Sequence, residues 1–315
     1  MSDVWRIGRG EPGYPRALLD LEQDVPAALF GCGSRRLVSE LDPEQTVTIV
    51  GSRHPSGYGL EVAEELGYLL GAAGLVVVSG MALGIDSAVH RGVLAGNGST
   101  IAVLGGGPDV VYPRSEHRLY ERIVAKGAVI SEMPSGTRPG PGAFPLRNRI
   151  MAALAKMTVV VEAAQPSGSL ITAERARELG RDVGAVPGRV TSRVAKGTNA
   201  LLKDGVAMVR DAQDVLDLLL GVGVTSTRRS GPRLEPELAR VADAVDGGAA
   251  TPDAVALAAG VDASEAAVAL ARLELMGYLR VDGAGRYERT SLTPPDEEPS
   301  TTLGPCEPTN GSRSA

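Results

Sequence analysis

Short segments rich in glycine and serine follow four apolar runs of this 315-residue chain. Glycine lets a backbone approach a ligand closely, and the free N–H groups of a following helix start, together with serine hydroxyls, form a site for an anion. Any doubly wound sheet needs tight turns, but four of them at one sheet edge favour a phosphate-rich ligand. The segments are Gly51-Ser52-Arg53, Ser79-Gly80, Gly105-Gly106-Gly107 and Ser167-Gly168-Ser169.

A second candidate segment contains Phe144, Arg147, Asn148 and Arg149. Pro145 suits the first turn of a helix, where arginines are disfavoured by the helix dipole unless they serve an anion. Arg147 either binds that anion or pairs with a carboxylate. Phe144 either stacks on a nucleobase or packs against the start of the helix, and both interpretations stay open.

The formal net charge of the chain is −6, which taken alone disfavours a nucleic-acid binder. That average hides a basic stretch, because residues 138–210 contain 12 Lys or Arg against 5 Asp or Glu. This excess, to which Lys203 belongs, is what a groove that follows a phosphate backbone requires. A part of it can equally be the solvated face of a helix.

Several kinds of site are disfavoured by missing motifs. The chain has no P-loop, no G-x-G-x-x-G fingerprint and no nucleophile elbow, and its 3 histidines have no metal-ligand spacing. We therefore expect no catalytic residue, no metal and no cofactor. Two distant cysteines, no secretory signal and no long apolar run indicate a cytoplasmic protein without a membrane span.

Apolar runs alternate with helical segments between residues 45 and 220. Runs that are apolar throughout are typical of strands buried on both faces, so we predict an α/β fold with an extended Rossmann-like, doubly wound, mostly parallel sheet. Strands are expected at 47–50, 75–78, 101–104, 128–130, 158–161, 183–186 and 207–209, and helices at 57–73, 84–96, 114–126, 145–156, 169–180, 194–203 and from 211.

The flanks of this domain have other compositions. Residues 1–44 are expected to be a short N-terminal lead-in that packs on it, and residues 221–234 to be a linker. Three helices and a Gly-turn hairpin predict a small C-terminal winged helix at 235–290. Residues 291–315, rich in Pro, Ser, Thr and Glu, are expected to be disordered.

The ordered motifs of residues 12–212 resemble the DNA-processing protein A (DprA/Smf) family. The motifs that carry the resemblance include Gly51-Ser-Arg53, Ser79-Gly-Met-Ala-Leu-Gly-Ile-Asp86 with His90, Tyr112-Pro113, Phe144-Pro-x-Arg-Asn-Arg149, Ser167-Gly-Ser-Leu-Ile-Thr-Ala173, Val186-Pro-Gly188 and Gly197-x-Asn199. The resemblance implies a homodimeric, non-enzymatic protein that binds single-stranded DNA, loads the RecA recombinase and acts in natural transformation and recombination. It also implies that Gly51-Ser52-Arg53 holds a phosphate, with Arg147, Arg149 and Ser167-Gly168-Ser169 as further contacts.

The predicted winged helix resembles an optional third domain of that family. Residues 233–290 contain 6 basic and 10 acidic residues, and the candidate recognition helix 264–277 contains Glu265 and Glu274 beside Arg272. This charge favours contact with a protein over reading of a duplex groove.

Two other functions remain open. The same sheet edge resembles the lysine-decarboxylase-like nucleoside-monophosphate phosphoribohydrolases, in which case Glu162 and the glycine turns would hydrolyse an N-glycosidic bond. That family's P-G-G-x-G-T-x-x-E run is absent from the chain. The third interpretation is a sensor of a small nucleotide.

Overall fold

The computed structural model describes residues 3–140, 142–222, 231–282 and 284–290, together with residues 292 and 294. It divides into two compact units, Met1–Arg228 and Arg229–Ala315. Most of the predicted disordered tail and residues 223–230 of the predicted linker lie outside the described residues.

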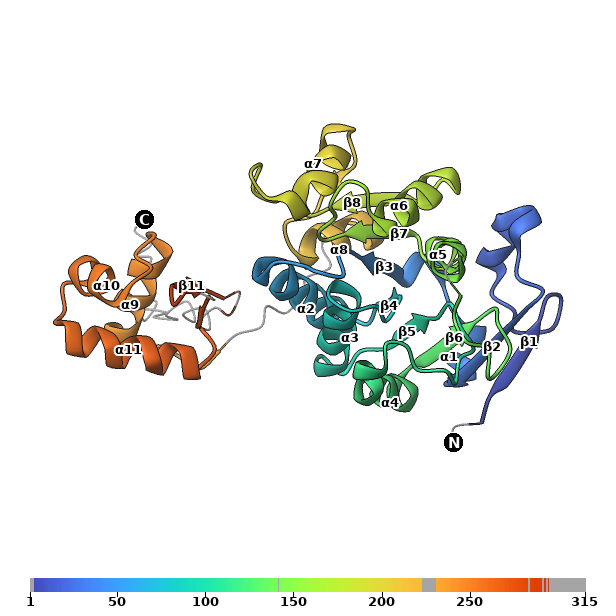
Figure 1. Cartoon of the computed structure of the whole chain (residues 1–315), viewed down its shortest axis with the longest axis horizontal. Helices are drawn as coiled ribbons and strands as arrows, with labels where there is room; N and C mark the ends of the chain where they lie inside the picture. The colour runs from blue at the N-terminus through green and yellow to red at the C-terminus, as the bar shows by residue number, and fades with distance from the viewer. Residues whose placement is uncertain are drawn as a thin grey trace, which may run out of the picture. The chain divides into compact units, whose positions relative to one another are not determined.

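Unit 1 is built on one sheet, whose strand order is β1-β2-β6-β5-β4-β3-β7-β8-β9 (Figure 1). The seven strands from β6 to β9 pair in parallel, which confirms the predicted mostly parallel α/β fold. The strands are β1 Trp5–Gly8, β2 Ala28–Gly33, β3 Thr46–Val50, β4 Val76–Ser79, β5 Thr100–Val103, β6 Ala128–Ser131, β7 Met157–Val160, β8 Asp182–Ala185 and β9 Ala207–Met208.

The strand order reverses between β3 and β7. From β3 the chain adds β4, β5 and β6 on one side, and from β7 it adds β8 and β9 on the other. Ligands of open α/β sheets bind beyond the carboxyl ends of the strands at such a switch point. Gly51-Ser52-Arg53 directly follows β3, and Ser167 lies in the segment after β7, so two of the predicted anion turns meet at this place.

The first 44 residues do more than the predicted packing on the domain. They contribute β1 and β2, which extend the sheet with antiparallel pairing, β1 to β2 and β2 to β6. The Trp5 indole donates a hydrogen bond to the Gly33 carbonyl and lies over Gly31, where a Cβ would overlap the ring. A tryptophan fixed on a glycine of the neighbouring strand explains why this edge of the sheet stays regular.

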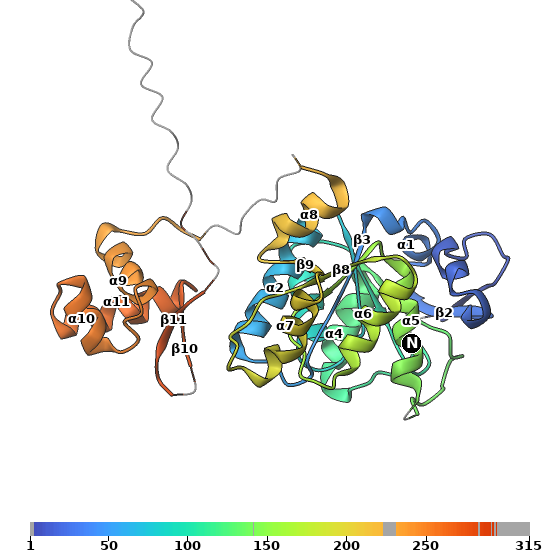
Figure 2. The same ribbon diagram turned by 90° about the horizontal axis from the view of Figure 1, so that it is seen from above.

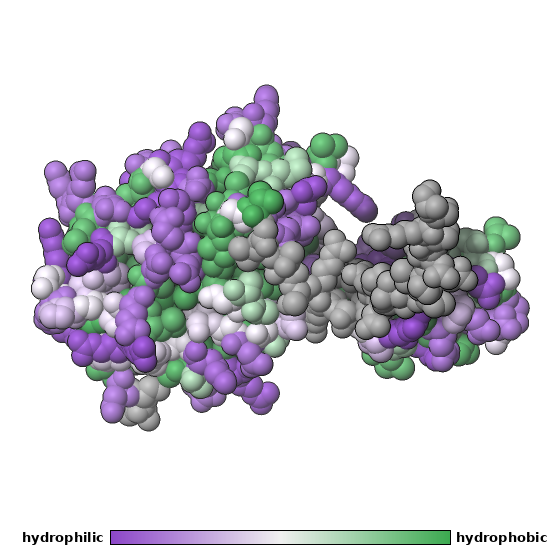
Figure 3. Space-filling model, turned by 180° about the vertical axis from the view of Figure 1, so that it is seen from behind, coloured by the Kyte–Doolittle hydropathy of each residue, from purple (hydrophilic) through white to green (hydrophobic). Residues whose placement is uncertain are grey.

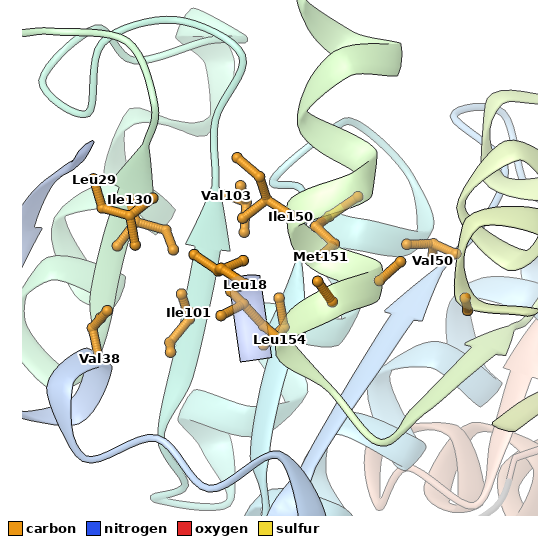
Figure 4. Packing of buried hydrophobic residues seen from close by; sticks show 14 of the residues in the cluster. Leu18, Leu29, Val38, Val50, Ile101, Val103, Ile130, Ile150, Met151 and Leu154 are labelled. Atoms are coloured by element: carbon orange, nitrogen blue, oxygen red, sulfur yellow. The ribbon is translucent and has the colours of Figure 1, made fainter. Parts of the chain in front are cut away.

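Helices cover both faces of the sheet (Figure 2). On one face, α5 brings Ile150, Met151 and Leu154 toward β5 side chains such as Ile101 and Val103, in the same cluster as Ile130 of β6 (Figure 4). On the other face, α2, α3 and α8 pack around Val47, Ile49 and Val159. The helices of unit 1 are α1 Arg35–Ser39, α2 Gly57–Ala72, α3 Ile85–Ala95, α4 His117–Lys126, α5 Ala143–Leu154, α6 Gly168–Glu178, α7 Lys196–Lys203 and α8 Ala212–Leu220, with 3-10 turns at Arg16–Asp24, Pro43–Gln45, Arg114–Glu116 and Arg193–Ala195.

Unit 2 has its own core and the predicted winged-helix elements. These are α9 Pro236–Asp246, α10 Pro252–Ala259, α11 Ala263–Leu275, and the antiparallel pair β10 Leu279–Val281 and β11 Tyr287–Arg289. Leu238, Val255, Leu270 and Tyr278 meet in this core. Asp262 begins α11 with a capping box to Glu265. In the described part of the chain no single helix is long and apolar enough to cross a membrane.

Candidate nucleic-acid interface

A cleft of about 480 Å³ lies at the switch point of the sheet. It is formed by the turn after β3, the first turns of α5 and the segment that leads into α6. The residues of the predicted site that line it are Gly51, Ser52, Arg53, Phe144, Arg147, Asn148, Ser167, Gly168 and Ser169. Segments more than 110 residues apart in sequence thus supply one site.

Arg53 and Phe144 form one wall of the cleft. The Arg53 guanidinium carbon lies 5.0 Å from the centre of the Phe144 ring, a cation–π distance. The Tyr112 ring lies 5.5 Å from the same ring. Behind this wall is a smaller, mostly apolar pocket of about 70 Å³ that Gly80, Gly105 and Gly106 help to line. The wall therefore offers an exposed cation next to an aromatic surface, which suits a phosphate and a base of the same nucleotide.

Arg147 forms the floor of the cleft and is 5% exposed. Its guanidinium donates to the Gly80 carbonyl at 2.7 Å, to the Val103 carbonyl and to Asn148 Oδ1 at 3.1 Å. It lies 3.8 Å from a carboxylate oxygen of Asp86. Arg147 thus ties the ends of β4 and β5 to α5. The sequence left two roles open for Arg147, binding of an anion or pairing with a carboxylate, and the structure contains the carboxylate partner, Asp86.

Burial controls the ionisation of this pair. It raises the pKa of the Asp86 carboxyl, an effect that nearby Arg147 partly opposes. It also lowers the pKa of Arg147 to about 10, although Asp86 acts in the other direction. An arginine with a pKa near 10 is still charged at neutral pH, and a single carboxylate compensates it. The floor of the cleft is therefore a buried ion pair, in which Asp86 compensates the charge of Arg147.

The opposite wall is the start of α6. Ser167 caps this helix by accepting a hydrogen bond from the Ser169 N–H, and the two hydroxyls are 2.8 Å apart. The Asn148 side-chain amide donates to the Gly168 carbonyl at 3.1 Å, so α5 holds this turn in place. A helix N-terminus with two serine hydroxyls is a favourable position for a phosphate.

Four residues of the predicted site lie elsewhere. The buried Ser79 hydroxyl donates to the Ile49 carbonyl and so links β4 to β3, while Gly80 lines the smaller pocket. Arg149 makes a two-pronged ion pair with Glu132 at 2.8 and 2.7 Å, and also donates to the Asp24 and Leu146 carbonyls. Its guanidinium is already used inside the domain and Arg149 does not line the cleft, so a phosphate contact at Arg149 stays a prediction.

Lys203 is the other residue of the predicted site that lies away from the cleft, and its role in DNA binding stays a prediction. It ends α7, which returns from the carboxyl end of β8 to the amino end of the parallel strand β9. Lys203 therefore lies on the approach to the amino edge of the sheet, whereas the cleft lies at the carboxyl edge. A basic count along the sequence could not show this, because a helix carries its two ends to opposite edges of a sheet.

Glu162 has a structural role. Its carboxylate, 4% exposed as a residue, accepts hydrogen bonds from the Ser56 N–H at 2.8 Å and the Ser56 hydroxyl at 2.6 Å. Gly59 packs so closely on it that a Cβ would overlap the carboxylate. Glu162 fixes the start of α2 and is not among the residues that line the cleft.

Two residues of the site were not predicted. Asp86 lines the cleft, and its carboxylate accepts a hydrogen bond from the Ala82 N–H. Tyr112 completes the aromatic wall. The available signal for Tyr112 was its position after the glycines that follow β5, which places it at the same edge of the sheet.

The fold and the cleft together define a class: a Rossmann-like α/β protein with a cleft at its switch point and an appended winged helix. Residues 5–220 match the model of the DNA recombination-mediator protein A family, and residues 225–285 match the DprA winged helix domain. The chain belongs to the DNA recombination-mediator protein A family.

Curated relatives share this assignment. A putative DNA processing protein DprA of Mycobacterium tuberculosis is 39% identical over 84% of this chain and 69% of its own length. Protein Smf of Escherichia coli is 36% identical over 89% of this chain and 78% of its own length.

Solved structures agree with the fold. DNA processing protein A of Streptococcus pneumoniae superposes with a TM-score of 0.63 at 40% identity, covering 68% of this chain and 74% of that one. The Helicobacter pylori protein, whose structure is described in terms of its single-stranded DNA binding mode, gives 0.62 at 29% identity over 70% of this chain and 98% of that one.

Proposed function

We propose that this protein is a non-enzymatic recombination mediator that binds single-stranded DNA in the cleft between β3 and β7. The observation that carries the proposal is the gathering of Arg53, Phe144 and the Ser167-Gly168-Ser169 turn around one cleft. In the described part of the chain Arg53 has no carboxylate within ion-pair distance, so its charge is available to a phosphate. The Helicobacter pylori relative, described as binding single-stranded DNA, supports the same ligand.

The shape of the site favours a single strand over a duplex. A base can stack on the Phe144 wall only if it is unpaired and turned out of a helix. Phosphates would accept hydrogen bonds from the N–H groups after β3 and at the start of α6. Such contacts depend on the charge of the backbone and not on the base sequence. Binding is therefore expected to depend strongly on salt and weakly on base composition.

The partners are part of the proposal. We infer a cytoplasmic homodimer that delivers DNA to RecA in recombination and in natural transformation, as the family assignment suggests. Hydrophobic residues gather on the face of unit 1 seen in Figure 3. Met208 on the outer strand β9 is exposed, as are Leu218 and Leu220 on α8, and these side chains are candidates for the dimer interface.

Fluorescence anisotropy with labelled single-stranded and duplex oligonucleotides over a salt series tests the binding function. We expect tighter binding of the single strand, and an Arg53→Ala variant that binds about tenfold more weakly, with the slope of log affinity against log salt reduced by about 0.7. Arg122→Ala, an exposed arginine on α4, is the matched control. Equal affinity for duplex, or an unchanged slope in Arg53→Ala, would contradict the proposal.

A further inference from the structure

The outward face of α11 in unit 2 is apolar and has no partner in the described part of the chain. Val268 is 59% exposed and Leu275 is 88% exposed, while Ala266, Leu270 and Leu273 on the opposite face are buried. At 100° per residue, Val268, Ala271 and Leu275 share one stripe with Ser264. Large apolar side chains at this exposure on one helix face mark a contact surface.

The charges beside the stripe disfavour nucleic acid as the occupant. A helix that reads DNA presents Arg or Lys, but α11 has two glutamates, Glu265 and Glu274, and one arginine, Arg272. Six basic and ten acidic residues in 233–290 give the surrounding unit a negative charge. A phosphate backbone would be repelled here, so a protein surface is the better match.

We propose that α11 packs against α11 of a second copy of this chain, antiparallel, across a two-fold axis between Val268 and Ala269. With a rise of 1.5 Å per residue, Leu275, Ser264 of the second copy, Ala271 and Val268 of the second copy then follow one another along the axis at spacings of about 3 Å. The two Val268 side chains meet at the centre, about 1.5 Å apart along the axis, and the symmetric set follows beyond them. The small residues let the helices approach closely, while Val268 and Leu275 become buried.

Charge complementarity selects this register. About that axis, Glu265 lies opposite Arg272 of the second copy, and the symmetry repeats the pair. Glu274 lies beside the first turn of the second α11, where a helix dipole favours a negative group. Arg272 at present binds Glu235 at 3.1 Å, but both side chains are about half exposed, so exchange of partner costs little.

The contact is weak on its own. One pair of 13-residue helices buries less than the roughly 1,000 Å² expected of a stable stand-alone interface. It gains strength when two copies are already held together, because the second contact is then intramolecular and has a high effective concentration. The surface is thus suited to join neighbouring copies of the protein, and this inference does not depend on the DNA cleft.

Disulfide trapping in the full chain tests the proposal. In a Cys306→Ser background, Val268→Cys places a thiol next to its symmetry mate, while the native Cys32 stays buried. Asp243→Cys, exposed on α9, is the control and removes a negative charge, which only favours random collision. We expect covalent dimers to form at least tenfold faster in Val268→Cys than in the control. Equal rates would overturn the proposal.

Charge reversal then tests the register. Added to Val268→Cys, either Glu265→Arg or Arg272→Glu should slow trapping several-fold, and both together should restore it. Circular dichroism checks that α11 still forms, since Glu265 also belongs to the capping box. Failure of the double change to restore trapping would overturn the antiparallel register. Protection of the Val268→Cys thiol by duplex DNA without any covalent dimer would assign the face to nucleic acid instead.

Discussion

Replacement of Arg147 by methionine tests whether the cleft floor is held by a buried ion pair. Methionine keeps most of the length of the side chain but removes every polar contact. The Gly80 and Val103 carbonyls lose their donor, and Asp86 loses the guanidinium 3.8 Å away. Breaking a buried pair by removing one partner costs about 3–5 kcal/mol, because an uncompensated charge remains.

Asp86→Asn and the double variant give the other two losses of stability that the comparison needs. Asp86→Asn alone should cost about 1–2 kcal/mol, since Arg147 keeps its carbonyl partners. In the double variant no charge is left unpaired, so the loss should fall short of the sum of the two single losses by about 2 kcal/mol. That difference is the coupling free energy of the pair.

The pH dependence of Arg147→Met follows from the sign of the Asp86 shift. Burial already holds the pKa of Asp86 above its usual value, and removal of Arg147 takes away the largest influence that lowers it. A group with a raised pKa in the folded state stabilises at low pH and loses this contribution as pH rises. The deficit of Arg147→Met relative to wild type should therefore widen as the pH rises through the raised pKa of Asp86.

Urea unfolding followed by tryptophan fluorescence is a suitable assay. The chain has a single tryptophan, Trp5, and it lies on the outer strand of the unit 1 sheet. The signal thus reports on the unit that contains the cleft and is not mixed with unfolding of unit 2. Additive losses in the double variant, or a deficit that does not change with pH, would refute the buried ion pair as the element that holds the floor.

Three further predictions concern the same domain. Gly80→Ala places a Cβ on the Arg147 guanidinium and should cost about 1–3 kcal/mol in urea unfolding, whereas Gly140→Ala, which meets open space, should be close to neutral. Burial lowers the pKa of His90 to about 3, so below about pH 6.5 the unfolded chain binds a proton that the folded chain does not. Between about pH 7 and 5 the free energy of unfolding of wild type should therefore fall by about 2 kcal/mol more than that of His90→Asn. Equal losses in the two proteins would contradict this. Arg149→Met should destabilise by about 3–5 kcal/mol yet leave the salt slope of DNA binding unchanged; a reduced slope at intact folding would return Arg149 to the interface.

The sequence was a good guide to the parallel part of the sheet and a poor one to its first strands. The run expected at 158–161 is β7, Met157–Val160, one residue away, because a strand buried on both faces is apolar at every position. β1 and β2 are short and contain Gly8, Gly31 and Gly33, residues that weaken any strand signal. Their pairing depends on β6, a partner that local patterns do not reveal.

The sequence predicted those parts of the candidate site that are formed by backbone turns. It did not predict which of the charged side chains are paired with one another. Turns such as Gly51-Ser52-Arg53 follow strands, and strand ends share an edge by topology. The ion pairs of Arg147 and Arg149 are made with Asp86 and Glu132, carboxylates that come from other parts of the chain. Two arginines that lie two residues apart on one helix look equivalent in sequence, but only Arg147 lines the cleft.

The antiparallel strands β1 and β2 also constrain the order of events during synthesis. The inner neighbour of β2 is β6, which leaves the ribosome about a hundred residues later. Until then the pair of β1 and β2 has two unpaired edges and no sheet to join, and a two-stranded pair is marginal by itself. The segment of β1 and β2 is therefore synthesised first but is among the last to reach its native pairing. A nascent chain stalled before β6 should expose Trp5, which would make this tryptophan an early target for chaperones.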